Sequence, residues 1–242
     1  MNDDSFTGAT APRLNILGPA QLVGAHGERP DRASAQCVEY CAWILNNPGR
    51  TAPEMREALA VAEGTRRTNM SRLRLWLGST NTGDLYLPCA YNDRIELHPD
   101  VTSDWEEFAL LMSVGIANNS EDELDKALGL VRGIPLSDAC GKWQWAASWR
   151  SQILASIRDV ALRLVDLALQ RSDFDAARWA VSTAMTALER DHDLVLAGIR
   201  IEHLAGNQSD AKRLLLREAR DHPADDEHRF SNEYVDLLHL VI

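Results

Sequence analysis

The sequence predicts a mainly α-helical protein with small β-hairpins, in which a winged helix-turn-helix is followed by a tetratricopeptide-like helical repeat domain. Three observations predict this order: short alternating segments confined to the first hundred residues, two helix starts close together between residues 51 and 77, and a 34-residue period late in the chain. The chain has 242 residues, of which 45% are hydrophobic and 25% charged. Such a composition is typical of a globular protein with a buried core.

The first elements are a hairpin and a helix. Residues 13–24 hold two apolar runs separated by Gly18-Pro19, which predicts a small β-hairpin. A helix over about residues 32–46 follows, with Asp31 as its expected N-cap. Its apolar positions recur with helical spacing and predict one buried stripe, formed by Cys37, Tyr40, Cys41, Ile44 and Leu45.

Two shorter helices and a second hairpin complete the first domain. Thr51 and Glu54 form a capping box that predicts a helix start. Gly64-Thr65 is expected to break this helix and to cap the next one, 66–77, which Gly78 ends. Residues 84–97 alternate around Asn92-Asp93 and predict a hairpin. Together these elements predict a winged-helix domain over residues 12–100.

From residue 101 onward the pattern is helical only. Two further capping boxes, Ser103 with Glu106 and Ser120 with Glu123, predict helix starts. A shift of 34 residues places Leu162 on Leu196 and Ala177 on Ala211, and it aligns the small polar turns 172–173 and 206–207. This is the tetratricopeptide period. It predicts a tetratricopeptide-like domain over residues 101–242.

Four segments carry a resemblance to a known family: LNILGPAQLVG near the N-terminus, NMSRLRLWLG over residues 69–78, HPDVTSDWEEF over residues 98–108, and ALGLVRGIP over residues 127–135. In this order they resemble the actinobacterial antibiotic regulatory proteins, which join a winged helix to a bacterial transcriptional activation domain. One branch of that family forms the C-terminal part of larger multidomain proteins. The resemblance implies a transcriptional regulator that binds double-stranded DNA. It also implies a helical domain that contacts RNA polymerase or a second copy of the chain, as in a homodimer.

The helix over residues 66–77 is the strongest candidate for DNA contact. It carries Arg66, Arg67, Arg72 and Arg74 and no acid, and its apolar residues recur on one inward face. Arginine and asparagine read base edges, and arginine and serine also bind phosphate. The candidate DNA-binding residues are Arg66, Arg67, Asn69, Ser71, Arg72, Arg74, Arg94 and Arg50. The alternative is a solvated arginine face.

The charge distribution leaves a second function open. The formal net charge is −11, of which −2 falls in residues 1–100 and −9 in residues 101–242. The predicted wing lacks the paired glycines of the family, and Asp93 and Glu96 flank its single Arg94. Carboxylates at a wing repel phosphate. The alternative function is therefore a non-enzymatic protein-protein interaction module with a degenerate, non-DNA-binding winged helix in a larger assembly.

A tryptophan cluster is the second candidate site. Trp143, Trp145 and Trp149 lie close together, and the last two share a helical face. They are interpreted either as aromatic anchors for a protein partner or as core packing.

The remaining sequence features argue against a catalytic or metal-binding function. We interpret the cysteines, Cys37, Cys41, Cys89 and Cys140, as buried thiols, and Asp191 as a helix cap rather than a metal ligand. No hydrolase, kinase, nucleotide-binding or zinc motif occurs, so we expect no catalytic residue, no cofactor and no metal. The N-terminus has no signal-peptide pattern and no apolar run reaches membrane-spanning length, which predicts a cytoplasmic protein without membrane contact.

Overall fold

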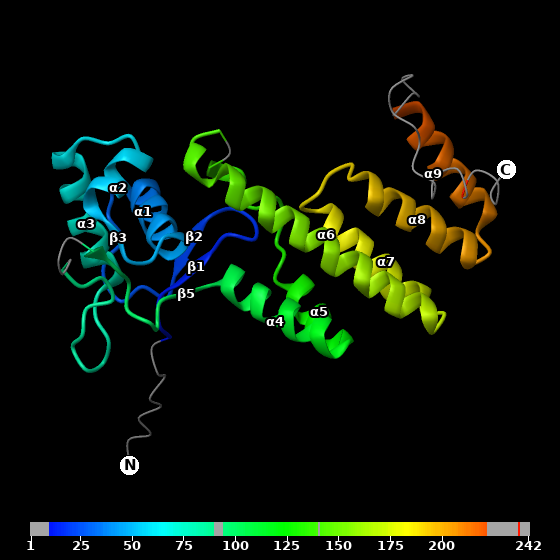
Figure 1. Cartoon of the computed structure of the whole chain (residues 1–242), viewed down its shortest axis with the longest axis horizontal. Helices are drawn as coiled ribbons and strands as arrows, with labels where there is room; N and C mark the ends of the chain where they lie inside the picture. The colour runs from blue at the N-terminus through cyan, green and yellow to red at the C-terminus, as the bar shows by residue number, and fades with distance from the viewer. Residues whose placement is uncertain (1–9, 90–93, 140, 222–236, 238–242) are drawn as a thin grey trace, which may run out of the picture. The chain divides into compact units, whose positions relative to one another are not determined.

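The hairpin predicted near the N-terminus is confirmed in the computed structural model, which describes residues 10–89, 94–139, 141–221 and 237. Strand β1 (Arg13–Asn15) pairs antiparallel with β2 (Gln21–Val23), with Leu14 opposite Leu22. Strand β5 (Thr102–Ser103) adds to the other side of β1 in parallel, so the sheet order is β2-β1-β5 and β2 is an edge strand (Figure 1). The side chain of Leu14 is fully buried.

Three helices form the rest of this domain: α1 (Ser34–Asn46), α2 (Ala52–Ala58) and α3 (Glu63–Leu77). The predicted stripe of α1 is buried at Cys37, Tyr40, Cys41 and Ile44 and partly buried at Leu45. The prediction that Asp31 caps α1 is wrong, because Ala33 takes a left-handed φ of 66° and the helix begins at Ser34. The capping box of Thr51 and Glu54 is confirmed in both directions.

Helix α3 begins earlier than the sequence predicted. The break after α2 lies at Ala60, which has φ of 51°, and not at Gly64-Thr65. Gly64 and Thr65 instead lie in the first turn of α3, where backbone N–H groups lack helical partners in any case. Gly78 ends the helix as predicted, with φ of 76°.

The predicted hairpin over residues 84–97 is also wrong in its pairing. Strand β4 (Arg94–Ile95) pairs antiparallel with β3 (Arg50–Thr51) rather than with residues 84–89. Leu85 forms an isolated antiparallel bridge with Ser79, and Arg74 of α3 binds the carbonyl oxygens of Leu87 and Pro88. The predicted turn at Asn92-Asp93 lies outside the described residues.

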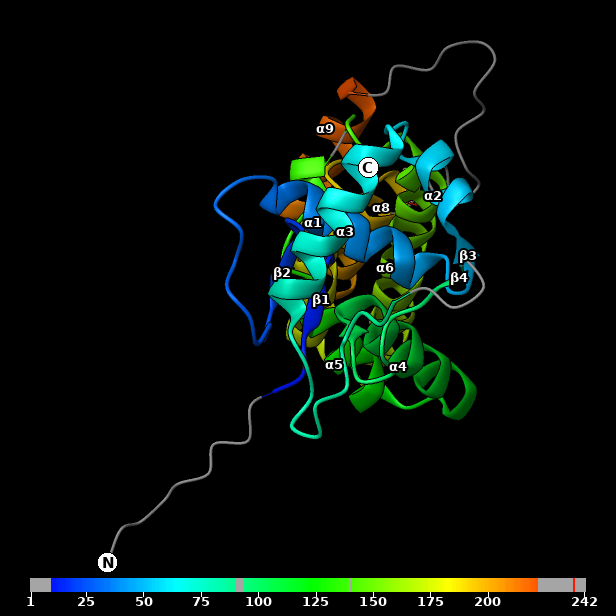
Figure 2. The ribbon, with the colours of Figure 1, turned by 90° about the vertical axis from the view of Figure 1, so that its left-hand side faces the viewer.

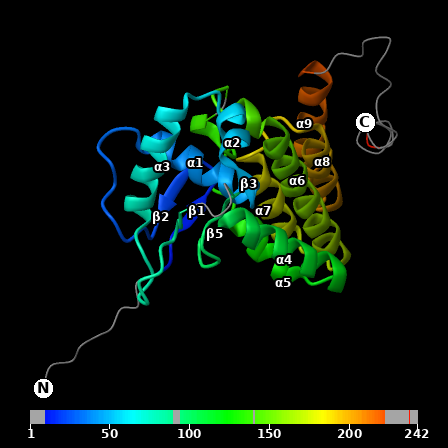
Figure 3. The same cartoon turned by 60° about the vertical axis from the view of Figure 1, so that its left-hand side comes forward.

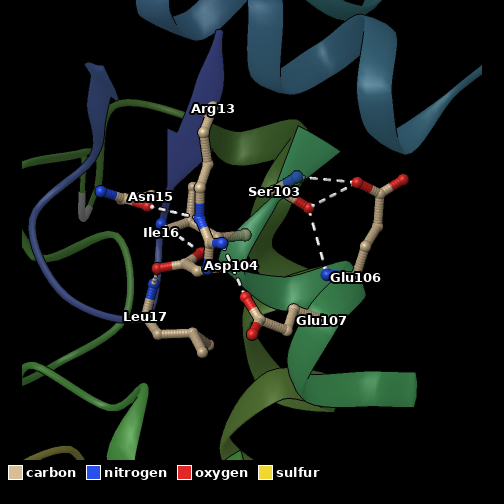
Figure 4. A network of polar contacts seen from close by, with 8 residues as sticks. All are labelled: Arg13, Asn15, Ile16, Leu17, Ser103, Asp104, Glu106 and Glu107. Atoms are coloured by element: carbon tan, nitrogen blue, oxygen red, sulfur yellow. Dashed lines mark hydrogen bonds and ion pairs between the residues drawn. The ribbon is translucent and has the colours of Figure 1, made fainter. Parts of the chain in front are cut away.

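A buried carboxylate joins the sheet to helix α4 (Asp104–Asn118). Asp104 is 2% exposed, and its two oxygens accept hydrogen bonds from Ile16 N at 2.7 Å and Leu17 N at 3.1 Å (Figure 4). One residue earlier, Ser103 forms the predicted capping box with Glu106. The start of α4 is thereby fixed to the end of β1.

The later helices are α5 (Glu121–Gly129), α6 (Ala147–Gln170), α7 (Phe174–Met185), α8 (His192–Leu204) and α9 (Gln208–Asp221), with short 3₁₀ turns η1 (Ser137–Ala139) and η2 (Gln144–Ala146) before α6. At Ser120, the hydroxyl contacts Glu123, but no side-chain cap of α5 forms.

The 34-residue repeat is confirmed by the helix bounds. Helices α6 and α8 end 34 residues apart, and α7 and α9 begin 34 residues apart. The equivalent turn residues Ser172 and Gly206 have φ of 60° and 81°, and the equivalent Ala177 and Ala211 are fully buried. Helices α7 and α8 lie side by side (Figure 3).

Arginines tie neighbouring repeat helices together. Arg178 of α7 donates to both oxygens of Glu202 of α8, which raises the pKa of Arg178 and lowers that of Glu202. Arg158 of α6 lies 3.6 Å from Asp191 and 3.5 Å from Asp193. These ion pairs connect α7 to α8 and α6 to the start of α8.

The chain divides into two compact units: residues 1–107 with 135–151, and residues 108–134 with 152–242. The segment after α5 thus belongs with the β1–β2 sheet, whereas the sequence placed a single boundary near residue 100. Leu136 N donates to the carbonyl oxygens of Ile16 and Gly18, and Asp138 accepts from Ala20 N.

Candidate nucleic-acid interface

Helix α3 has one buried and one exposed face. Met70, Leu73, Trp76 and Leu77 are at most 6% exposed, as their spacing predicted. The exposed residues of the helix are Gly64, Thr65, Arg67, Thr68, Ser71 and Leu75. The apolar face holds the helix against its domain, so the exposed face is presented on a rigid element.

The N-terminal turn of α3 is less basic than expected. Because the helix begins at Glu63, it contains an acid, which binds Arg66 at 2.8 Å and Arg67 at 2.6 Å. These hydrogen bonds lower the pKa of Glu63 to about 2. The side chain of Arg66 is only 12% exposed, whereas that of Arg67 is 76% exposed. Of this pair, Arg67 alone faces solvent widely.

Asn69 does not face solvent, contrary to the prediction. It is 4% exposed, its carbonyl oxygen accepts from the Cys37 thiol at 3.8 Å, and its side-chain oxygen accepts from Arg72 at 3.2 Å. Arg72 is half-buried as a result. Asn69 therefore orients Arg72 and is not itself placed to reach a ligand outside the domain.

Arg74 is committed within the domain. Its Nε donates to Leu87 O at 2.8 Å and its Nη2 to Pro88 O at 3.3 Å. Since both acceptors belong to the segment that precedes β4, Arg74 links α3 to the wing region.

Arg50 and Arg94, 44 positions apart in sequence, lie on paired strands. Both are exposed; Arg50 forms an ion pair with Glu54 at 2.8 Å, and Arg94 donates to Gly49 O at 3.1 Å. The structure thus brings these two predicted residues together on the β3–β4 sheet.

Leu75 is a surface residue that sequence reasoning missed. It is 72% exposed, on the face that carries Thr68 and Ser71. The sequence contained the information to predict this exposure, because Leu75 follows Thr68 and Ser71 at helical spacing and lies outside the buried stripe.

The loop after β2 secures the C-terminal end of α3. His26 N donates to Leu77 O at 3.1 Å, and Gly27 N donates to Trp76 O at 2.9 Å. These bonds satisfy carbonyl groups that have no partner within the helix. A Cβ at Gly27 would lie 1.8 Å from Leu75 O, so only glycine fits there.

The three tryptophans stack on one another. The ring centroids of Trp143 and Trp145 are 5.8 Å apart, and those of Trp145 and Trp149 are 6.1 Å apart. Trp149 is 7% exposed, and Trp145 donates to Glu39 of α1 at 3.2 Å. This placement favours the core-packing interpretation for Trp149 and Trp145, and it leaves Trp143 as the outer ring of the stack.

The thiols differ in exposure. Cys37 and Cys41 are buried, and burial raises their pKa values to about 11 and about 12. Cys89 is exposed, so the prediction of a buried thiol is wrong there; Cys140 lies outside the described residues.

The predicted capping role of Asp191 is confirmed, since its side chain accepts from Leu194 N at 3.2 Å. The neighbouring His192 binds Glu218 at 2.6 Å. The part of the chain that the structure describes contains no group of three or more histidine, cysteine or acidic side chains placed to hold a metal ion. Within the same residues, no helix combines the length and the apolar character needed to cross a membrane.

The chain matches no protein-family model and no curated protein. Among solved structures it is similar to Mycobacterium tuberculosis EmbR in complex with a low-affinity phosphopeptide. The sequences are 19% identical, the TM-score is 0.69, and the match covers 95% of this chain and 64% of that one. The expected fold, a winged helix followed by tetratricopeptide-like helices, is thereby confirmed. The likeness to EmbR is one of fold.

Proposed function

We propose that the chain is a DNA-binding transcriptional regulator in which α3 enters the major groove. The observation that supports this most is the rigid, polar exposed face of α3, where Arg67, Thr68 and Ser71 stand clear of a fully buried apolar face. A helix of this diameter fits the groove, and arginine and serine side chains bind bases and phosphates. Arg72 stands at the edge of this face, where Asn69 orients it.

Arg50 and Arg94 serve as phosphate contacts in this proposal. They lie together on the β3–β4 sheet and are exposed, as contacts to a DNA backbone require. Phosphate contacts of this kind set the register of a protein on the duplex and carry no sequence information.

The helical repeats take the second role that the family resemblance implies. They would contact a protein partner, such as RNA polymerase, or a second copy of the chain in a homodimer. A regulator of this type would act in the cytoplasm.

Binding of a labelled duplex, followed by fluorescence anisotropy at several salt concentrations, tests the proposal. Random-sequence duplex should bind at about 50 mM salt and weaken as salt rises. Arg67→Ala with Arg72→Ala should weaken binding at least about tenfold and reduce the salt slope by one to two phosphate contacts, at about 0.9 each. The matched control is Arg213→Ala on α9, which pairs with Asp210 of its own helix and should leave binding unchanged. Absence of binding, or equal binding by the double variant, would refute the proposal.

The alternative function, a protein-interaction module without DNA binding, is favoured by two observations: Glu63 neutralises the first turn of α3, and Leu75 is exposed on its outer face. One variant separates the two functions. Glu63→Gln removes a carboxylate from the DNA-facing turn, so it should tighten duplex binding if α3 meets DNA. If α3 meets protein, the variant should leave DNA binding undetectable.

A further inference from the structure

Among the described residues no strand pairs with the outer edge of β2, whose residues Gln21 and Val23 are exposed. At the two ends of β1, Pro12 O accepts from Thr102 N and Ile16 N donates to Asp104. The backbone N–H and C=O groups of even-numbered residues along β1 therefore point away from β2. Backbone directions alternate in an antiparallel ladder. The N–H and C=O of Leu22 therefore point to the open side, and no described residue hydrogen-bonds to them.

A hollow of about 610 Å³ lies beside this edge. It is lined by the consecutive residues Ala20–Ala25 and by Arg29, Val38 and Trp76. Its volume lies within the range of about 300–1,000 Å³ typical of ligand sites. A strand added to β2 would occupy this space, because neighbouring strands lie about 4.8 Å apart.

The wall opposite the strand is held in place. The segment that joins β2 to α1 swings outward beside α3 (Figure 2), and it is fixed there by the bonds from His26 and Gly27 to the last carbonyls of α3. Because the Gly27 position has no room for a Cβ, this approach is close. The hollow is consequently formed before any partner arrives, which reduces the entropy lost on binding.

The hollow is also lined by an exposed arginine, Arg29. Arg29 lies 5.9 Å from the centre of the Trp76 ring and donates to Ser34 Oγ at 3.4 Å. Among the described residues no acid forms an ion pair with it, in a chain that contains 36 acidic residues. A guanidinium held over a tryptophan ring is pre-organised to bind a carboxylate.

We propose that β2 and the Arg29–Trp76 wall accept an extended acidic peptide segment of a partner protein, which pairs with Leu22 as an additional strand and places a carboxylate on Arg29. Backbone pairing of this kind gives affinity and the side-chain pocket gives specificity. The Asp138 carboxylate, which accepts from Ala20 N, closes one end of the edge and limits the added strand to a few residues near Leu22. This inference does not depend on DNA binding by α3.

Amide chemical shifts of the ¹⁵N-labelled full chain test the proposal. The probe is the peptide acetyl-Thr-Val-Glu-Val-Thr-amide. Saturable shifts centred on Leu22 and Gly24 support the proposal. Replacing the peptide glutamate by lysine, or Arg29 by glutamine, should raise Kd at least about tenfold, as expected for a hydrogen bond to a charged group. The matched control is Arg32→Gln, an exposed arginine outside the hollow, which should leave Kd unchanged.

A second pair of reagents isolates the backbone contribution. N-methylation of the three central peptide amides should abolish the shifts without altering the protein. Leu22→Pro should do the same, because proline is tolerated on an edge strand where its missing N–H faces outward. No saturation up to about 5 mM peptide, equal binding of the lysine peptide, or shifts centred on other elements would overturn the proposal.

Discussion

Replacing Asp104 by alanine should destabilise the first unit more than any loss of a surface ion pair. Asp104 is 2% exposed, and it is the acceptor for the backbone N–H groups of Ile16 and Leu17 (Figure 4). Alanine would leave both donors buried without this partner. Each unsatisfied buried donor costs about 1–3 kcal/mol, and removing a buried carboxylate recovers part of its desolvation. We therefore expect a loss of about 3–4 kcal/mol.

Two matched variants separate the loss of the hydrogen-bond acceptors from the loss of a charge. Asp104→Asn keeps one acceptor oxygen and should lose about half as much as alanine. Glu107→Gln removes the half-exposed ion pair with Arg13, whose atoms are 2.6 Å apart, and should cost at most about 1 kcal/mol.

The assay is urea unfolding followed by circular dichroism, combined with hydrogen exchange at the Ile16 and Leu17 amides. Exchange at these two amides should accelerate strongly in Asp104→Ala and little in Glu107→Gln. If Asp104→Ala lost no more than about 1 kcal/mol, or if these amides kept their protection, the bonds to Asp104 would not hold β1 to α4, and the reasoning would be refuted.

Four further predictions follow from the same structure. Burial raises the pKa of Glu39, so ionisation of this carboxyl destabilises the folded protein as pH rises above about 4.3. Glu39→Gln keeps an acceptor for Trp145 and should raise Tm at pH 7 but not at pH 4. The same difference in Tm at both pH values would contradict this. Arg66 and Arg67 lower the pKa of Glu63 to about 2. The ionised Glu63 therefore stabilises the fold above about pH 4.3, and this contribution is lost as pH falls towards 2. A ¹³C titration of the Glu63 carboxyl with a midpoint near pH 4.3 would refute this prediction. Raised pKa values and burial should protect Cys37 and Cys41 from maleimide at pH 7, while Cys89 reacts, as peptide mass spectrometry would show. Gly206→Ala should cost about 1 kcal/mol because φ is 81°, whereas Ser172→Gly, at the equivalent turn, should be neutral or stabilising in thermal unfolding.

The exposed face of α3 shows which side-chain positions the helical spacing predicted and which it did not. The spacing of Met70, Leu73, Trp76 and Leu77 predicted the buried face of α3 correctly. The same pattern placed Asn69 and all four arginines outside, and this was wrong for Asn69 and incomplete for Arg66 and Arg74. Arg66 pairs with Glu63, which the predicted helix start at residue 66 left out of the helix. Arg74 binds carbonyl oxygens of a later segment, whose position the pattern of α3 does not specify.

Two features of the fold could not be predicted from the sequence for a related reason. Strand β4 pairs with β3, more than forty residues earlier, and the segment Pro135–Ser151 joins the first unit through hydrogen bonds to Ile16, Gly18 and Ala20. Short strands and loops carry too few side chains to specify a partner by their own periodicity. Their pairing is decided by the donors and acceptors that the folded core leaves available.

The sequence by itself determined the helices and their repeat, because capping boxes, helical spacing and a 34-residue period are local properties of the chain. Only the tertiary structure decided which polar groups remain for partners. It assigned Arg74 to the wing segment and Asp104 to the sheet, and it left Arg29 and the edge of β2 facing a hollow. The physical reason is that a hydrogen bond or ion pair depends on distances of about 3 Å between groups, and folding sets those distances between residues that are remote in sequence.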